Sequence, residues 1–374
     1  MNSQFPILDS PAPYFNHAAV GPWPRATAEA ASAFADENMH HGSANYMDWL
    51  KREERLRRNL ARLTGASSGD DIALLKNTTE GICLVAAGLD WQAGQNVVLP
   101  ADEFPSNRLP WLALAGRGVK AREVDIRAAG DAEQALLDAM DHDTRLLTVS
   151  SVQWTDGFRL DLERLGRACH ERGVLFFVDA IQQLGALPLD VEAAHIDFLA
   201  ADAHKWLLGP EGIAVFYCRE ERRPQLRLQQ HGWHMVDRFW DFDRDQWEPS
   251  STALRFEAGT PNSIGQAALD ASVSLFLQTG MDAVSARVLD NTSQLIDGLQ
   301  AMTGIHVTSH TEDERRSGIV AFTHDRFDPN EIYRGLQRQG VSCAIRGGAV
   351  RLSPHYYQGE RDLEAFFRLL HHIV

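Results

Sequence analysis

Cysteine is scarce in this chain of 374 residues, and the few cysteines do not cluster. Cys83, Cys169, Cys218 and Cys343 lie far apart in the sequence and form no CxxC pair. A disulfide scaffold or a structural zinc site needs paired or closely spaced thiols. The sequence therefore argues against both, and we expect no metal site.

Long apolar runs and an excess of positive charge are also missing. No run of about 18 apolar residues occurs, as a membrane-spanning helix would need, and residues 1–15 contain no signal-peptide pattern. The 36 lysines and arginines face 51 aspartates and glutamates, which gives a net charge of −15. That balance argues against nucleic acid or an anionic membrane as a partner. We expect a cytoplasmic protein.

The length suits a large domain joined to a smaller one. From residue 72 to about 220, short apolar runs alternate with helical patterns, which indicates a mostly parallel sheet covered on both faces. We predict an N-terminal arm over 1–15, a large domain over 16–260 and a small α+β domain over 261–374. Helices are expected near 26–39 and 46–65, an irregular segment over 221–261, and small-domain strands near 305–308, 318–323 and 341–353.

The sharpest local signal is the segment ADAHKWLLGPEG at residues 201–212. Lys205 follows a predicted buried strand, lies beside His204 and precedes a Gly-Pro-x-Gly turn. Such a lysine would lose part of its hydration, which lowers its pKa and makes the amine available for a Schiff base. Taken alone, a loop lysine is more often a surface residue, so the interpretation depends on the other motifs.

A carboxylate ends the apolar run VLFFVD. Asp179 would lie at the carboxyl end of a central parallel strand, where open α/β sheets bind their ligands. Pyridoxal 5′-phosphate (PLP) needs an acid at such a place, because a carboxylate against the pyridine nitrogen keeps the ring protonated and electron-withdrawing. Gln182 could then hydrogen-bond the 3′ oxygen of the ring. An ordinary helix N-cap is the alternative for Asp179.

Three further segments carry groups that suit such a cofactor and its substrate. In IALLKNTTEG, Thr78 and Thr79 begin a helix whose N-terminus could bind a phosphate, although an ordinary capping sequence fits equally well. Phe104, just after the strand NVVLP, could stack on a planar ring. Arg351, in a short strand of the small domain, has a planar fork that matches a carboxylate.

In this order, the segments NTTEG, EFPSN, VDAIQ, DAHKW, FEAGTPN and VRLSPHYY resemble the class V aminotransferase family of fold-type I PLP-dependent enzymes. This family includes cysteine desulfurases, kynureninases and isopenicillin N epimerase-like proteins. The resemblance extends from residues 14–22 to residues 351–357. It implies an α/β fold of the fold-type I PLP-dependent transferases, with a mostly parallel central sheet flanked by helices and a smaller α+β C-terminal domain.

The resemblance also implies a role for each matching residue. Lys205 would hold PLP as a Schiff base and move the Cα proton through a quinonoid intermediate, with Asp179 on the pyridine nitrogen and His204 as a further catalytic residue. Asp202 stands where many relatives have a serine, and a carboxylate there conflicts with a phosphate dianion. Expected cofactor contacts come from Thr78, Thr79, Phe104, Asn107, Asp179, Gln182, Asp202, His204, Lys205 and, reaching a neighbouring subunit of a homodimer, Thr260. Expected substrate contacts come from Asn16, His17, Trp154 and Arg351.

One departure from the desulfurases concerns their catalytic thiol. Desulfurases carry a mobile-loop cysteine a few residues after an arginine that is here Arg346. In this chain Arg346 is joined to Arg351 by a short link without a cysteine. Cys343 precedes the arginine in an expected strand, where a buried cysteine is usually a packing residue. We therefore do not expect persulfide-forming desulfuration.

We expect a PLP enzyme that acts on a small amino acid as a lyase or an aminotransferase. Phe104 and the VQW segment around Trp154 look kynureninase-like and favour lyase chemistry slightly. An epimerase or racemase is an alternative, with His17, His231 or His234 as a second acid/base, and a non-catalytic PLP-binding protein is another. The aromatic segment 231–249 is predicted to line the substrate entrance; its aromatic residues include Trp233, Trp240, Phe242 and Trp247.

Overall fold

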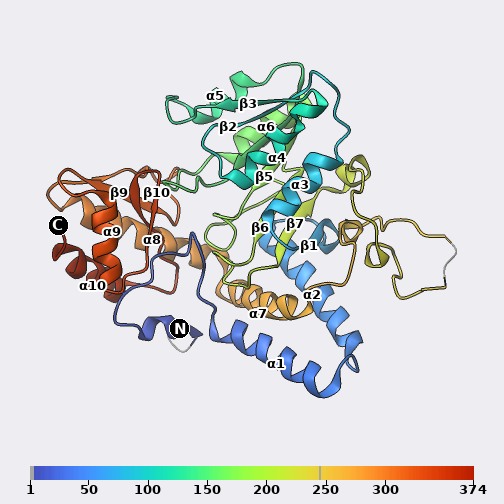
Figure 1. Cartoon of the computed structure of the whole chain (residues 1–374), viewed down its shortest axis with the longest axis horizontal. Coiled ribbons are helices and arrows are strands. Elements are labelled where there is room, and N and C mark those ends of the chain that lie inside the picture. Colours follow the sequence, from blue (N-terminus) through green and yellow to red (C-terminus); the bar gives the residue numbers. More distant parts are fainter. Residues whose placement is uncertain (1–3, 244–245) are drawn as a thin grey trace.

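The computed structural model describes residues 4–243 and 246–374 of the chain. A seven-stranded sheet with the strand order β1-β7-β6-β5-β4-β2-β3 forms the centre, and a four-stranded sheet with the order β10-β11-β9-β8 forms a second, smaller unit (Figure 1). This arrangement confirms the predicted α/β class, with a large helix-flanked sheet and a smaller α+β unit.

The central sheet is mostly parallel. Its strands are β1 (Ile72–Leu75), β2 (Asn96–Pro100), β3 (Lys120–Val124), β4 (Thr144–Ser150), β5 (Leu175–Asp179), β6 (Phe198–Asp202) and β7 (Ala214–Cys218). From β3 to β6 all neighbours pair in parallel, whereas β7 runs antiparallel to β6 and β1. Strands β2, β5 and β7 are buried along their whole length, which is why they read as unbroken apolar runs.

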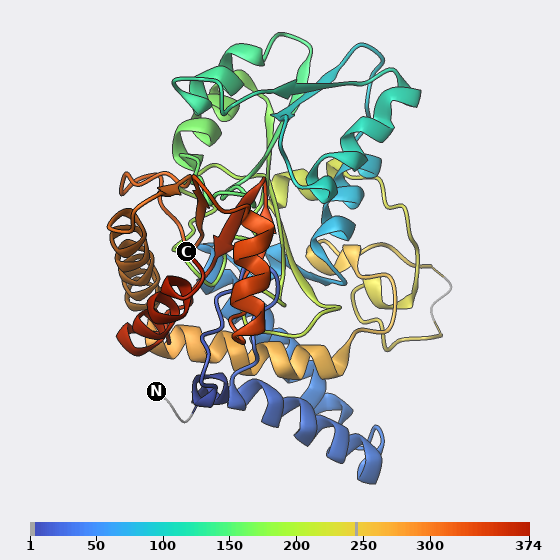
Figure 2. The same cartoon turned by 60° about the vertical axis from the view of Figure 1, so that its left-hand side comes forward.

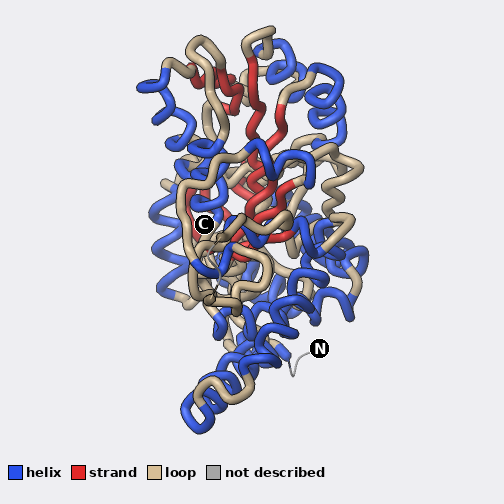
Figure 3. The backbone as a smooth tube through the Cα atoms, turned by 90° about the vertical axis from the view of Figure 1, so that its right-hand side faces the viewer, coloured by secondary structure: helices blue, strands red, loops and turns tan. Residues whose placement is uncertain are grey.

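Helices cover both faces of this sheet, as the tube in Figure 3 shows. They are α1 (Arg25–His41), α2 (Tyr46–Thr64), α3 (Thr78–Gly88), α4 (Leu109–Leu112), α5 (Ala132–Ala139), α6 (Leu162–Arg172) and α7 (Ser263–Thr279). Alternate side chains of β5 enter different cores: Phe176 and Val178 pack on one face, whereas Phe177 packs on the other. This alternation is the ordinary pleat of a strand buried on both sides.

The smaller unit contains β8 (Ile305–Val307), β9 (Val320–His324), β10 (Ala344–Arg346) and β11 (Ala349–Leu352), with α8 (Met281–Gln300), α9 (Pro329–Arg338) and α10 (Glu360–His371). Its core takes in Leu295 from α8 and Phe15 from the N-terminal arm. By contrast, α7 packs on α1 and α2 and lies beside α1 in Figure 2. The structure thus places α7 with the large sheet, while the domain boundary after residue 260 stays a prediction.

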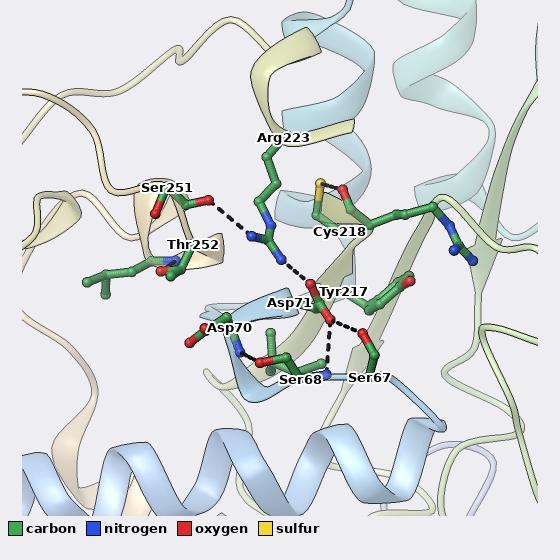
Figure 4. Close-up of polar contacts among 12 residues, drawn as sticks. Ser67, Ser68, Asp70, Asp71, Tyr217, Cys218, Arg223, Ser251 and Thr252 are labelled. Carbon is green, nitrogen blue, oxygen red and sulfur yellow. Dashed lines mark hydrogen bonds and ion pairs between the residues drawn. The ribbon is translucent and has the colours of Figure 1, made fainter. Parts of the chain in front are cut away.

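A buried ion pair ties the irregular segment that follows β7 to the start of β1 (Figure 4). Arg223, in the 3-10 helix η6 (Glu220–Gln225), pairs with Asp71, and both side chains are only 5% exposed. Arg223 also donates to the carbonyl of Ser251 over 3.0 Å, and Asp71 accepts a hydrogen bond from the Ser67 hydroxyl. The pair therefore links three segments that are distant in sequence.

No helix in the described part of the chain is both long and apolar enough to cross a membrane.

Candidate active site

The carboxyl ends of β5 and β6 and the N-terminus of α3 meet at one cavity of about 310 Å³. Helix α3 packs closely against β6 beside this cavity: a Cβ on Gly81 of α3 would lie 2.9 Å from the Cβ of Ala200 in β6. The glycine in the NTTEG motif is thus needed so that α3 can approach the sheet. The residues that line the cavity are Ala18, Ala19, Thr78, Thr79, Phe104, Ser106, Trp154, Asp179, Ile181, Gln182, Asp202, His204, Lys205, Arg346 and Arg351.

Lys205 and Asp179 form the buried centre of the cavity. Burial lowers the pKa of Lys205 to about 8, against the opposing effect of Asp179. Burial likewise raises the pKa of Asp179 to about 6, although the carboxylate accepts a hydrogen bond from the backbone N–H of Ile181 over 3.1 Å. The Lys205 amine also lies 5.7 Å from the centre of the Phe104 ring. An amine with this lowered pKa is available as a nucleophile and base near neutral pH.

The amide of Gln182 is held in one orientation. Its Oε1 accepts from the indole N–H of Trp206 over 2.9 Å, and its Nε2 donates to the carbonyl of Ala18 over 3.0 Å. The second hydrogen of Nε2 remains available toward the cavity. A donor fixed in this way suits a phenolic ring oxygen, the role predicted for Gln182.

Hydroxyl groups and backbone N–H groups gather at the N-terminus of α3. The Thr79 hydroxyl donates to Ser106 over 2.8 Å, and the Thr78 hydroxyl accepts from the backbone N–H of Asp202 over 2.9 Å. His204 lies on the same side, with Nδ1 3.8 Å from a carboxylate oxygen of Asp202. A helix N-terminus with free donors favours an anion such as a phosphate.

Two arginines from the smaller unit, Arg346 and Arg351, also line the cavity. Arg351 is 2% exposed and donates to the carbonyl of Trp154 over 2.5 Å, and its Nε has no partner. Burial, reinforced by Arg346, lowers the pKa of Arg351 to about 9. Within the described residues, neither guanidinium pairs with a carboxylate. A buried positive charge without a counter-ion favours the binding of an anion, such as a substrate carboxylate.

Two of the predicted substrate contacts, Asn16 and His17, do not line the cavity. The backbone of Asn16 bridges to Ser353 of the smaller unit. The ring of His17 is fully buried between the carbonyl of Ser353 at 2.7 Å and the hydroxyl of Tyr357 at 2.5 Å. Their neighbours Ala18 and Ala19 take the positions at the cavity. Any role of Asn16 and His17 toward the substrate stays a prediction.

Two of the predicted cofactor contacts also lie elsewhere. Asn107 is buried behind the cavity, where its Oδ1 accepts from Thr148 over 2.7 Å and from Trp111 over 3.2 Å. Thr260 lines a separate cavity of about 430 Å³ together with His231. Thr260 can therefore contact a cofactor only in a second subunit, as predicted from the resemblance, and that contact stays a prediction.

Two polar residues near this site have no predicted role in the sequence analysis: Ser106, which lines the cavity and accepts a hydrogen bond from α3, and Glu103. The Glu103 carboxylate is 4% exposed and accepts from both the backbone N–H and the hydroxyl of Ser150, each over 2.5 Å. Ser150 pairs with Asp179 across β4 and β5. Burial raises the pKa of Glu103 to about 7, and Asp179 adds to this effect. Its place directly before Phe104, at the end of a buried strand, is the signal that could have identified it.

The cavity fits PLP group by group. It offers a buried amine for an aldehyde, a buried acid for a ring nitrogen and hydroxyls at a helix N-terminus for a phosphate. Two residues on its wall, Asp202 and Arg351, each have a buried polar atom without a partner among the described residues, Oδ1 and Nε respectively. Buried polar groups are normally satisfied, so these side chains keep hydrogen-bonding capacity for a bound group.

The comparisons with known proteins agree with this geometry. The model of the family described as Aminotransferase class-V matches residues 13–366. A probable cysteine desulfurase of Methanothermobacter thermautotrophicus is 31% identical in an alignment of 382 residues, which covers 96% of this chain and 94% of that protein. The uncharacterized aminotransferase YcbU of Bacillus subtilis is 28% identical over 89% of this chain and 87% of that protein.

Solved structures show the same fold. A mutant of C-DES with glycine covalently linked to its PLP cofactor has a TM-score of 0.91 at 25% identity, covering 99% of both chains. The complex of the cystine C–S lyase C-DES with its product cysteine persulfide has a TM-score of 0.87 at 25% identity, covering 96% of this chain and 97% of that chain. The chain thus belongs to the class V aminotransferase family and is a PLP-dependent enzyme.

Proposed function

We propose that this enzyme is a carbon–sulfur lyase that catalyses β-elimination from a cystine-like amino acid. The main support for the proposal is the short backbone connection between the two arginines of the cavity. Arg346 ends β10 and Arg351 lies in β11, and the strands are joined by a tight turn through Gly347 and Gly348. This turn leaves no room for a mobile loop and contains no thiol.

The four cysteines are also unsuited to accept sulfur at the cavity. None of them lines it. Cys169, Cys218 and Cys343 are buried, and burial raises the pKa of all three thiols, to about 12 for Cys169 and Cys343. Since the thiolate is the reactive form, these groups are inert. Cys83 is exposed but lies at a different cavity.

The side chains at the cavity can carry out the elimination. Bound PLP supplies the electron sink that stabilises negative charge at Cα. Arg351 binds the substrate carboxylate, Lys205 removes the Cα proton, and Asp179 keeps the ring nitrogen protonated. With cystine, the Cβ–S bond breaks and its electron pair leaves with the sulfur. Cystine and water thus give cysteine persulfide, pyruvate and ammonia. The similarity to the cystine lyase C-DES supports this substrate class.

The alternatives have less support from the described residues. An epimerase needs a second acid/base at the cavity; His17 and His234 do not line it, and His231 lies with Thr260 at the separate cavity. His17 is held by Ser353 and Tyr357, and His234 is fully buried elsewhere. A non-catalytic PLP protein has no need of a buried, unpaired Arg351.

Product analysis tests the proposal. We expect purified holoenzyme to release pyruvate and ammonia in equal amounts from cystine without any added 2-oxo acid, and Lys205→Ala to release neither. After the enzyme has been removed by filtration, pyruvate is measured with lactate dehydrogenase and ammonia with glutamate dehydrogenase. Alanine as the product from cysteine would indicate a desulfurase instead. Turnover only with an added 2-oxo acid would indicate an aminotransferase.

The proposal includes a cytoplasmic homodimer in which Thr260 reaches the phosphate of the neighbouring subunit's PLP. The exposed aromatic side chains Trp233, Trp240 and Trp247 do not line the cavity of their own chain. They would reach a substrate entrance only across such an interface, and residues 244 and 245 of this segment lie outside the described residues. Light scattering tests the dimer, and a weaker PLP affinity of Thr260→Val tests the contact.

A further inference from the structure

Asp202 places a carboxylate at the phosphate-binding end of the cavity. It ends β6, and its backbone N–H donates to Thr78 at the first position of α3. The side chain lines the same cavity as Thr79 and Ser106, and its buried Oδ1 has no hydrogen-bond partner among the residues that the structure describes. A donor or a proton is therefore missing on this oxygen.

The charged groups around Asp202 do not neutralise it by an ion pair of good geometry. The ring of His204 is 3.8 Å away, and burial and the charge of Lys205 lower the pKa of that histidine. The charge of Lys205 acts on Asp202 without an ion pair, and Asp202 in turn raises the pKa of Asp179. Burial raises the pKa of Asp202 to about 6, with Thr78 and Lys205 acting against it.

A phosphate dianion in this place would meet the carboxylate directly. Two anions in contact in a buried site repel strongly, and such pairs are stable when they share a proton. The second pKa of a phosphate monoester is about 6, close to that of Asp202. A single proton shared between the two groups is therefore accessible near neutral pH.

We propose that Asp202 binds the phosphate of PLP as a protonated carboxylic acid, so that cofactor binding takes up one proton. This inference concerns cofactor binding and holds whichever reaction the enzyme catalyses. The direction of the pH dependence follows from the coupling between proton binding and cofactor binding. Above about pH 7 both free partners have lost the shared proton, so the complex must regain it and affinity falls as pH rises. One proton corresponds to a tenfold weaker affinity for each pH unit.

The experiment measures the affinity of apoenzyme for 4-deoxypyridoxine 5′-phosphate, which has no aldehyde and cannot react with Lys205. Dissociation constants are measured by fluorescence between pH 6.5 and 8.5 for the wild type and for Asp202→Asn, in which an amide donor replaces the acid. Titrations of Lys205, Asp179 and the ligand ring are common to both proteins. We expect the affinity of the wild type to fall about 100-fold more than that of Asp202→Asn over these two pH units.

Two controls make the result specific. Asp102→Asn removes a carboxylate that pairs with Arg127 outside both this cavity and the one with Thr260, so it should keep the wild-type pH dependence. 4-Deoxypyridoxine without a phosphate should show the same pH dependence in wild type and Asp202→Asn. Calorimetry in buffers of different ionisation enthalpy should give one more proton taken up by the wild type at pH 8.

Parallel pH dependences of the wild type and Asp202→Asn would overturn the proposal, as would equal proton uptake. Asp202→Ser guards against a folding defect specific to the asparagine variant, and it too should lose the extra pH dependence. If both variants bind more weakly by a factor that does not change with pH, Asp202 contributes only ordinary hydrogen bonding and the proposal is wrong.

Discussion

Glu103 and Asp179 are two buried carboxylates, and the proximity of Asp179 adds to the effect of burial in raising the pKa of Glu103. Asp179 is 2% exposed and Glu103 4% exposed, and neither has an ion pair with an arginine among the described residues. Negative charges close together in a dry site disfavour each other's ionisation. With a pKa of about 7, Glu103 gains or loses its proton near neutral pH and so changes the field at Asp179. We infer that Glu103 is a positioning residue for the acid that faces the cofactor ring.

The Glu103→Gln substitution tests this role. The amide keeps the size of the side chain and can still accept from Ser150, but it cannot ionise. We expect the visible absorption band of the bound cofactor to lose a transition between pH 6 and 8 that the wild type shows. A pH titration of the holoenzyme spectrum measures it, and identical titrations of the two proteins would contradict the inference.

At the scale of elements, strand ends proved predictable from the sequence. Asp179, Asp202 and Lys205 follow apolar runs, and the carboxyl ends of parallel strands meet at one edge of a sheet. The N-terminal segment was less predictable. Because Asn16 bridges to Ser353 and the His17 ring faces Tyr357, Ala18 and Ala19 reach the cavity. This arrangement depends on how the arm packs on the smaller unit, which no local pattern contains.

The glycines that end two helices have similar backbone conformations but different surroundings. Both α2 and α6 are followed by a glycine in the left-handed conformation, with φ +72° at Gly65 and +67° at Gly173. A Cβ on Gly173 would meet nothing within 4 Å, whereas one on Gly65 would lie 2.8 Å from the backbone of Asp190. The left-handed conformation alone costs about 1–2 kcal/mol for alanine.

We therefore expect Gly173→Ala to lower the melting temperature slightly and Gly65→Ala to lower it clearly more, since only the second variant adds a clash with the backbone. Differential scanning calorimetry of the two variants beside the wild type measures the difference. Equal decreases would show that the contact with Asp190 relaxes at no cost.

At the scale of the whole molecule, the layers were predicted because unbroken apolar strands separated by helices allow few other arrangements. The boundary between the two units could not be predicted from this pattern. The helix α8 spans both cores, with Val284 and Val288 on the large one and Leu295 on the small one. A continuous helix has no linker composition that would reveal this change.

The buried pair of Arg223 and Asp71 contributes to stability at the same scale. Replacing Arg223 by methionine leaves the Asp71 carboxylate buried without its counter-ion, which typically costs about 3–5 kcal/mol. We expect a lower urea midpoint for Arg223→Met. The double variant Arg223→Met/Asp71→Asn should recover much of the loss, because no charge then remains buried. A double variant no more stable than the single one would contradict this explanation.

The central claim is that the reaction proceeds without a sulfur-accepting thiol of the protein. Cys83, the one exposed cysteine of the described residues, offers the most direct measurement: pyruvate formation from cystine by wild type and Cys83→Ser, with intact-protein mass spectrometry after turnover. We predict equal rates and no added sulfur atom on either protein. A protein-bound persulfide together with lost activity in Cys83→Ser would contradict the account.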